Sequence, residues 1–124
     1  MSFTYRSASY RKLFERLANE ALDVEWGANR IVLIFARHVY KLPLTKHGLE
    51  ANRKEARWSE AHGKTGEAPH IADCHIEYLD GLEVLWMEYV EPLSEPMVLP
   101  EWALAVDDIQ VGHDVDDRLV AYDL

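Results

Sequence analysis

Apolar side chains recur at intervals of three and four between residues 8 and 22, which predicts an amphipathic helix. Ser7 or Ser9 is suited to cap its first turn, because a serine hydroxyl accepts a hydrogen bond from a free backbone N–H. We expect this helix to lay its apolar stripe on a sheet. The stripe consists of Leu13, Phe14, Leu17, Ala18, Ala21 and Leu22.

The next stretch alternates between strand-like and helix-like patterns. Residues 31–35 and 39–42 are rich in β-branched and aromatic side chains, and the Arg-His break between them predicts two antiparallel strands. Pro43 ends the second run, and a helix is expected from about Leu49 to His62. Two further β-type runs, IADCHIEYLD and EVLWMEYVEPL, meet at Asp80-Gly81, a dipeptide typical of a hairpin turn.

The C-terminal third is punctuated by Pro92, Pro96 and Pro100 and then by a possible helical turn at 102–106. Residues 107–124 are expected to form a hairpin with an acidic turn at 114–117. The sequence therefore predicts one α+β domain over residues 1–124, an antiparallel sheet of about five strands with two flanking helices. It divides into an N-terminal helix (1–23), a core (24–90) and an acidic C-terminal hairpin region (91–124).

Composition excludes several classes of protein. The chain is 48% hydrophobic and 28% charged, as in ordinary globular domains, and no apolar run approaches the ~20 residues of a membrane span. The N-terminus lacks the apolar core of a signal peptide, and the lone Cys74 cannot form an internal disulfide. We therefore expect a protein of the bacterial cytoplasm, without membrane association.

Charge is divided unevenly along the chain. Residues 1–62 hold eleven Lys and Arg against seven Asp and Glu, whereas residues 63–124 hold two against fifteen. The excess acid of the second half is expected to face solvent, a cation or a basic partner. Direct binding of this half to nucleic-acid phosphates is disfavoured.

Five short segments, in order, resemble the small lobe of protein kinases, and in particular short kinase-like proteins of phages and mobile elements. They are VYKLP, ANRKEA, LWMEYVEPL, DDIQVG and RLVAYDL. The resemblance implies that Lys41 is the phosphate-contacting lysine, that Glu55 pairs with it, and that Asp123 stands at the metal-binding position. It also implies that backbone near residues 88–90 meets an adenine. The alternative for Lys41 and Glu55 is an ordinary ion pair without function.

Departures from the kinase pattern argue against catalysis. EWGANRIV replaces the glycine-rich loop, Gln110 falls where a metal-binding asparagine is expected, and no His-Arg-Asp motif is found. Asp107 or Asp108 stands in for the catalytic aspartate at a shorter spacing, and the sequence ends where most of a large lobe would begin. We expect no enzyme activity, no cofactor and at most weak binding of ATP with magnesium.

Other candidate sites have weaker patterns. His62, His70, Cys74 and His75 cluster in the sequence, but their spacing matches no zinc motif. The acidic turn at 114–117 lacks the glycine and terminal glutamate of a calcium loop, and Lys64 lacks the glycine spacing of a phosphate-binding loop. We expect no metal site and a structural, unreactive Cys74.

Charge and resemblance together predict a non-enzymatic acidic protein that binds a basic surface of a host protein or ribonucleoprotein. The class expected is a phage or mobile-element inhibitor of a nucleic-acid-guided defence complex, comparable to anti-CRISPR proteins that mimic DNA. The alternatives are a minimal ATP-binding phosphotransferase and a pseudokinase-like accessory module. The residues expected to bind the partner are Glu77, Asp80, Glu83, Asp107, Asp108, Asp114, Asp116 and Asp117.

Overall fold

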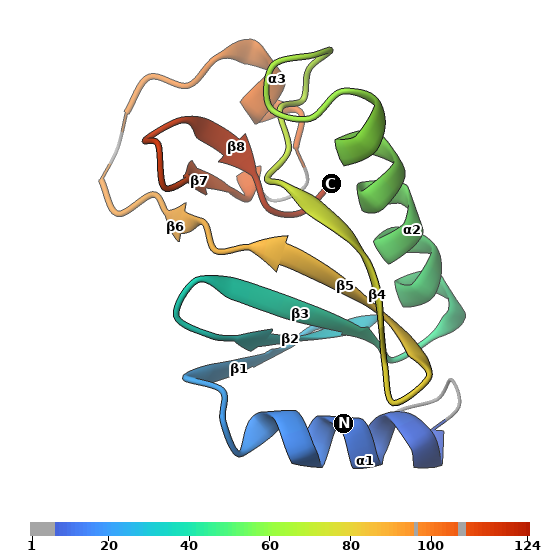
Figure 1. The fold of residues 1–124 in the computed structure, drawn as a ribbon. Coiled ribbons are helices and arrows are strands. Elements are labelled where there is room, and N and C mark those ends of the chain that lie inside the picture. The colour runs from blue at the N-terminus through green and yellow to red at the C-terminus, as the bar shows by residue number, and fades with distance from the viewer. Residues whose placement is uncertain (1–6, 96, 107–108) are drawn as a thin grey trace.

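The computed structural model describes residues 7–95, 97–106 and 109–124. These residues form three helices and two sheets, whose arrangement can be followed in Figure 1. In chain order the elements are α1 (Ser7–Ala18), β1 (Asp23–Trp26), β2 (Arg30–Ile34), β3 (His38–Pro43), α2 (Lys46–Ala61), β4 (Cys74–Leu79), β5 (Leu82–Glu88), β6 (Glu91–Pro92), α3 (Glu101–Leu104), β7 (Val111–His113) and β8 (Leu119–Ala121).

The main sheet has five antiparallel strands in the order β1-β2-β3-β5-β4, so the α+β fold class expected from the sequence is confirmed. The helix α2 connects β3 to the edge strand β4 and packs on one face of the sheet, while α1 crosses the other face (Figure 1). β1 was not expected, because only Val24 and Trp26 in its sequence favour a strand.

Most of the predicted apolar stripe lies on the sheet, but Leu22, beyond the end of α1, is 73% exposed, which corrects the expectation for that residue. Tyr10, Leu13 and Leu17 are buried against Leu42 and Val84, and full burial of one such side chain stabilises by roughly 1.5–3 kcal/mol. The helix ends at Ala18 rather than residue 22, because the chain then turns to pair β1 with β2. The N-terminal helix is therefore shorter than the sequence pattern indicated.

Turn chemistry fixes the ends of β4, β5 and α2. Asp80 and Gly81 both have positive φ values, 51° and 75°, as the tight turn between two antiparallel strands requires. The Thr45 hydroxyl accepts a hydrogen bond from the Gly48 N–H at 3.1 Å, so α2 begins three residues before the expected position. Gly48 is needed because a Cβ there would lie 2.0 Å from the Asn29 carbonyl oxygen.

The C-terminal region forms a second, three-stranded sheet in the order β6-β7-β8, and β7 and β8 are the hairpin expected there. A parallel bridge between Ile71 and Ala121 attaches it to the segment before β4. Val120 is buried with Leu85 and Met87, so both sheets share one apolar cluster. In the described ranges no helix is long and apolar enough to cross a bilayer.

Candidate functional site

Lys41 and Glu55 form a buried ion pair between β3 and α2. The Lys41 Nζ lies 2.9 Å from Glu55 Oε1, and the two side chains are 4% and 1% exposed. Lys41 alternates with the core residue Leu42 along β3, so its side chain points to the face that α2 covers. The structure therefore brings the two residues together inside the protein, and excludes an exposed surface pair.

Asp123 joins this pair through Arg30, which sequence reasoning did not select. The Arg30 guanidinium donates to both Glu55 oxygens at 2.8 and 3.0 Å and to Asp123 Oδ1 at 2.9 Å. It also donates to Asn52 Oδ1 at 3.1 Å. Arg30 begins β2 beside a turn, and no motif in the sequence marks it as a partner of residues far along the chain.

Three further hydrogen bonds hold this cluster. Lys41 Nζ donates to the Tyr122 carbonyl at 2.5 Å, and the Asn52 amide donates to the Lys41 carbonyl at 2.9 Å. The backbone N–H of Leu124 donates to Glu55 Oε2 at 3.1 Å, which holds the C-terminal segment beside α2. Two cations and two carboxylates thus form a closed network.

Burial and charge act in opposite directions on the network's carboxylates. Burial disfavours ionised Glu55, but the attraction of Lys41 and Arg30 outweighs it and lowers the Glu55 pKa to about 2. For Asp123, burial outweighs the attraction of Arg30 and raises the pKa above its usual range. Burial also disfavours charged Arg30, but the Glu55 carboxylate outweighs it, so the Arg30 pKa is raised.

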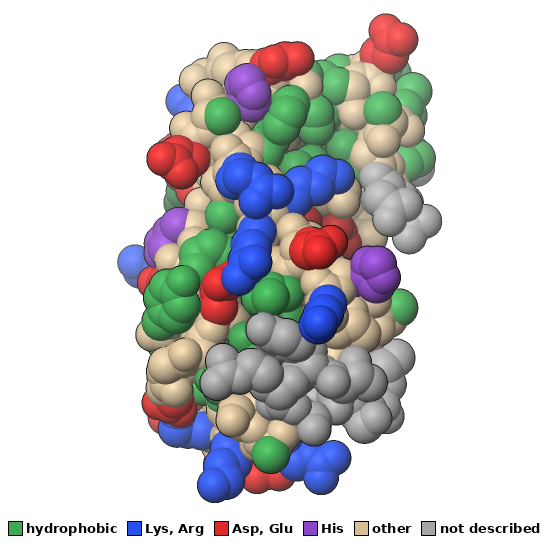
Figure 2. Space-filling model, turned by 90° about the vertical axis from the view of Figure 1, so that its right-hand side faces the viewer, with side chains coloured by type: hydrophobic (Ala, Val, Ile, Leu, Met, Phe, Trp, Pro, Cys, Tyr) green, Lys and Arg blue, Asp and Glu red, His purple; other side chains and the backbone are tan. Residues whose placement is uncertain are grey.

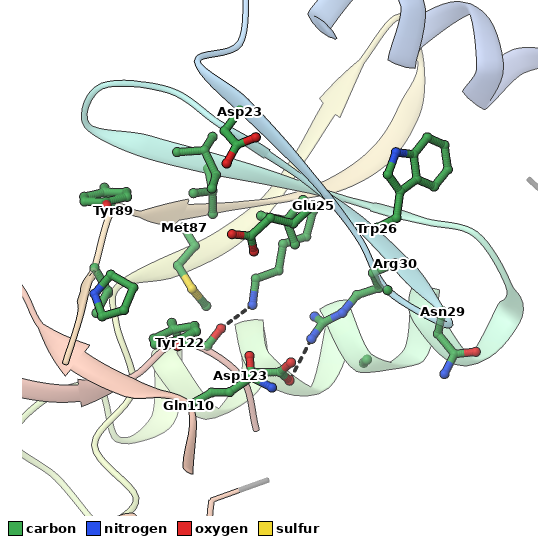
Figure 3. A pocket seen from close by; sticks show the side chains of 18 of the residues that line it. Asp23, Glu25, Trp26, Asn29, Arg30, Met87, Tyr89, Gln110, Tyr122 and Asp123 are labelled. Carbon is green, nitrogen blue, oxygen red and sulfur yellow. Dashed lines mark hydrogen bonds and ion pairs between the residues drawn. The ribbon is translucent and has the colours of Figure 1, made fainter. Parts of the chain in front are cut away.

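The network lies at a pocket of about 870 Å³. That volume is within the roughly 300–1,000 Å³ of small-molecule sites. Figure 3 shows the pocket with Asp23 and Glu25 on one side, Tyr122 and Asp123 on the other, and Met87 between them. Its apolar lining includes Val32, Ile34, Val39, Met87 and Val90, and Lys41 and Arg30 also line it.

The end of β5 borders the pocket and is held by Lys64. Its Nζ lies 2.8 Å from Glu88 and 2.7 Å from Asp114, so one amine ties β5 to the C-terminal hairpin. Burial disfavours the ammonium, but these carboxylates outweigh it and raise the Lys64 pKa. Lys64 is therefore a structural cation of the loop that follows α2.

Several of the acids expected to bind a partner are occupied within the protein. The prediction that Asp114 binds a partner at the surface is wrong, because its side chain is 0% exposed and pairs with Lys64. Glu83 lies 2.8 Å from Arg53, and Asp80 lies 3.2 Å from Arg16. Glu77 accepts a hydrogen bond from Tyr40 at 3.1 Å and lies 3.0 Å from His75.

Asp116 and Asp117 are exposed at the tip of the β7–β8 turn, as expected, and Asp107 and Asp108 lie outside the described residues. Three acids of the second half, Asp80, Glu83 and Asp123, pair with arginines of the first half, so folding compensates part of the acidic charge. Figure 2 shows Lys and Arg side chains gathered near the centre of the side where α2 lies.

The histidine and cysteine cluster does not assemble. Within residues 7–95, 97–106 and 109–124, no three His, Cys, Asp or Glu side chains are grouped so that they could hold a metal. His62 packs on Trp58, His70 on Trp102 and His75 on Trp86. Cys74 is buried, which together with nearby Glu55 raises its pKa to about 12, so its thiol is unreactive.

Comparisons with protein-family models, with curated proteins and with solved structures find no match to this chain.

Proposed function

We propose that this chain is a non-enzymatic ligand-binding domain whose pocket takes an adenine-type compound. The observation that carries the proposal is the buried Lys41–Glu55 pair beside a pocket of nucleotide-binding size. A strand lysine, a helix glutamate and a following aspartate are the elements that the kinase-like resemblance implies. Asp123, 82 residues beyond Lys41, lies in the same network.

The walls of the pocket support a flat heterocycle as the ligand. Val32 and Val39 lie on β2 and β3, Met87 lies at the end of β5, and Val90 lies between β5 and β6. Apolar walls of this kind bury a ring, while a few polar groups orient it. The backbone around residues 88–90 is the segment that the resemblance places against an adenine.

The charge network supports binding without phosphotransfer. Catalysis of that reaction depends on cations directed at the transferring phosphate. Here Arg30 donates to Glu55, Asn52 and Asp123, and Lys41 donates to Glu55 and Tyr122. Both cations would have to give up these partners to stabilise a phosphate.

Titration calorimetry with adenosine, AMP and ATP tests the proposal. Val32→Trp should fill the pocket and abolish binding, because Val32 lines it. Val98→Trp is the matched control, since Val98 is 95% exposed and does not line the pocket. Absence of binding for all three compounds at millimolar concentration, or binding that Val32→Trp leaves unchanged, would refute the proposal.

A second proposal is the acidic inhibitor function, which the exposed tip of the β7–β8 turn favours. Val115 is 89% exposed, and Asp116 and Asp117 beside it are exposed as well. An apolar side chain next to two carboxylates suits a basic protein surface with an apolar contact point. The partner proposed is a nucleic-acid-guided defence complex of a bacterial host, and its test is described below.

A further inference from the structure

The floor of the pocket is electrically balanced. Arg30, Lys41 and Asp123 line it, and Glu55, buried behind them, brings the total to two positive and two negative charges. Every one of these four groups is in contact with a group of opposite sign. A ligand phosphate would therefore find no uncompensated cation at the floor.

The rim of the pocket adds negative charge. Asp23 and Glu25 are exposed on β1 and line the pocket, and within the described part of the chain neither forms an ion pair. In Figure 3 both carboxylates lie on the side of the pocket across from Tyr122. The charge of Glu25 reaches the lining, because burial and then Glu25 raise the pKa of the Tyr122 hydroxyl.

The walls between rim and floor are apolar and aromatic. Val32 lines the pocket from β2, Met87 lies at the end of β5, and Tyr89 lies just after that strand (Figure 3). Electron-rich ring faces and a thioether attract a flat or cationic group, and neither donates a strong hydrogen bond to a phosphate. The three zones together favour a ligand without negative charge.

From this arrangement we propose that the pocket selects an uncharged or cationic nucleoside over its phosphorylated forms. The inference rests on the proposed function and names the ligand class of the same site. A nucleoside places its base between the apolar walls and its hydroxyls near carboxylates that accept hydrogen bonds. A phosphate in the same place would meet two rim carboxylates and would have to displace Arg30 from Asp123.

The first experiment compares adenosine, AMP and ATP by calorimetry at low salt in EDTA. Adenosine should bind, and AMP should bind roughly tenfold or more weakly, because like charges brought together in a partly desolvated site repel strongly. A parallel series with Mg²⁺ tests whether a cation carried by ATP reverses the order. If AMP or magnesium-bound ATP binds as tightly as adenosine, the selection is refuted while the proposed function stands. If no compound binds, the proposed function fails as well.

The second experiment alters the charge directly. Asp23→Asn combined with Glu25→Gln neutralises the rim without touching the buried network, and should bring AMP affinity closer to that of adenosine. Asp123→Asn should do the same by removing the negative charge that compensates Arg30, while its amide oxygen can still accept the Arg30 hydrogen bond. Asp116→Asn is the control, since it removes one exposed carboxylate that does not line the pocket. If the ratio of the dissociation constants of AMP and adenosine changes equally in all three variants, or in none of them, the inference is contradicted.

Discussion

Arg30 and Asp123 are separated by 93 positions in the chain, yet Arg30 Nη2 lies 2.9 Å from Asp123 Oδ1. This contact connects the start of β2 to the segment after β8, and Glu55 of α2 binds the same guanidinium. The first strands, the second helix and the C-terminal segment therefore meet at one charge network. Changes in that network should affect both stability and ligand binding.

Glu55→Gln should lower the free energy of unfolding by about 3–5 kcal/mol, because it leaves Lys41 buried without a counter-charge and Arg30 with Asp123 alone. Glu50→Gln, an exposed change on the same helix, should alter it by no more than about 0.5 kcal/mol. Urea unfolding followed by circular dichroism measures both. Equal and small effects of the two substitutions would show that the pair does not stabilise the fold.

Lowering the pH should reduce the stability of the folded protein through Glu55. Glu55 has a pKa of about 2 when folded and an ordinary value of 4.5, so between these values the unfolded chain binds more protons than the folded one. Stability from Glu55 is thus fully present above about pH 4.5 and is lost as the pH falls toward 2. The loss amounts to about 3 kcal/mol.

Unfolding midpoints at pH 6, 4 and 3 test this prediction. Between pH 4 and 3 the Glu55→Gln variant should lose less stability than the unaltered protein, because glutamine cannot be protonated in this range. Part of the pH dependence of stability should remain in the variant, because the pKa of Asp114 is also lowered. Burial disfavours the Asp114 carboxylate, but its hydrogen bonds with Lys64 and with the Arg118 backbone outweigh burial. Parallel slopes for the two proteins would contradict the role assigned to Glu55.

Local patterns were sufficient to predict most of the fold. The stripe containing Leu13 and Leu17 gave α1 its buried face, and Asp80-Gly81 marked the β4–β5 turn. The ends of the helices and strands were less predictable from local patterns. The start of α2 depends on a hydrogen bond to Thr45, and β1 forms because residues 23–26 pair with β2; residue propensities describe neither contact.

The candidate site was only partly predictable. Lys41 and Glu55 are 14 residues apart across one strand-to-helix connection, so their meeting follows from local order. The contact of Arg30 with Asp123 depends on the packing of the second sheet, which no local pattern specifies. For the same reason Asp114 appeared to be a surface acid, although the fold buries it against Lys64.

Lys64→Met should loosen the C-terminal hairpin, because Asp114 would remain buried and lose its cation. Hydrogen exchange of the β7 and β8 backbone amides should become faster, and unfolding should require about 3 kcal/mol less. Lys54→Met is the control on exposed α2 surface. Adding Asp114→Asn to Lys64→Met should recover part of the loss, because the amide carries no charge. No recovery would mean that the ion pair is not the cause.

Charge reversal at the tip of the β7–β8 turn tests the acidic inhibitor proposal. Asp116→Lys with Asp117→Lys should slow association with a purified nucleic-acid-guided defence complex, because long-range attraction to a basic surface would be lost. Asp114 is left unchanged, since reversing a buried charge would disturb the fold. The difference should be largest at low salt, as the screening length is only about 8 Å near physiological ionic strength.

Net charge alone would also slow association, so the matched control carries the same change elsewhere. Glu50→Lys with Glu60→Lys reverses two exposed carboxylates on α2, on the side where Lys and Arg side chains already gather (Figure 2). If the acidic tip binds specifically, the association rate should fall much more for the turn variant than for this control. The unaltered protein should also compete with nucleic acid for binding to the complex. Equal losses would assign the effect to net charge, and absence of competition would refute DNA mimicry, because a mimic must occupy the surface that holds nucleic acid.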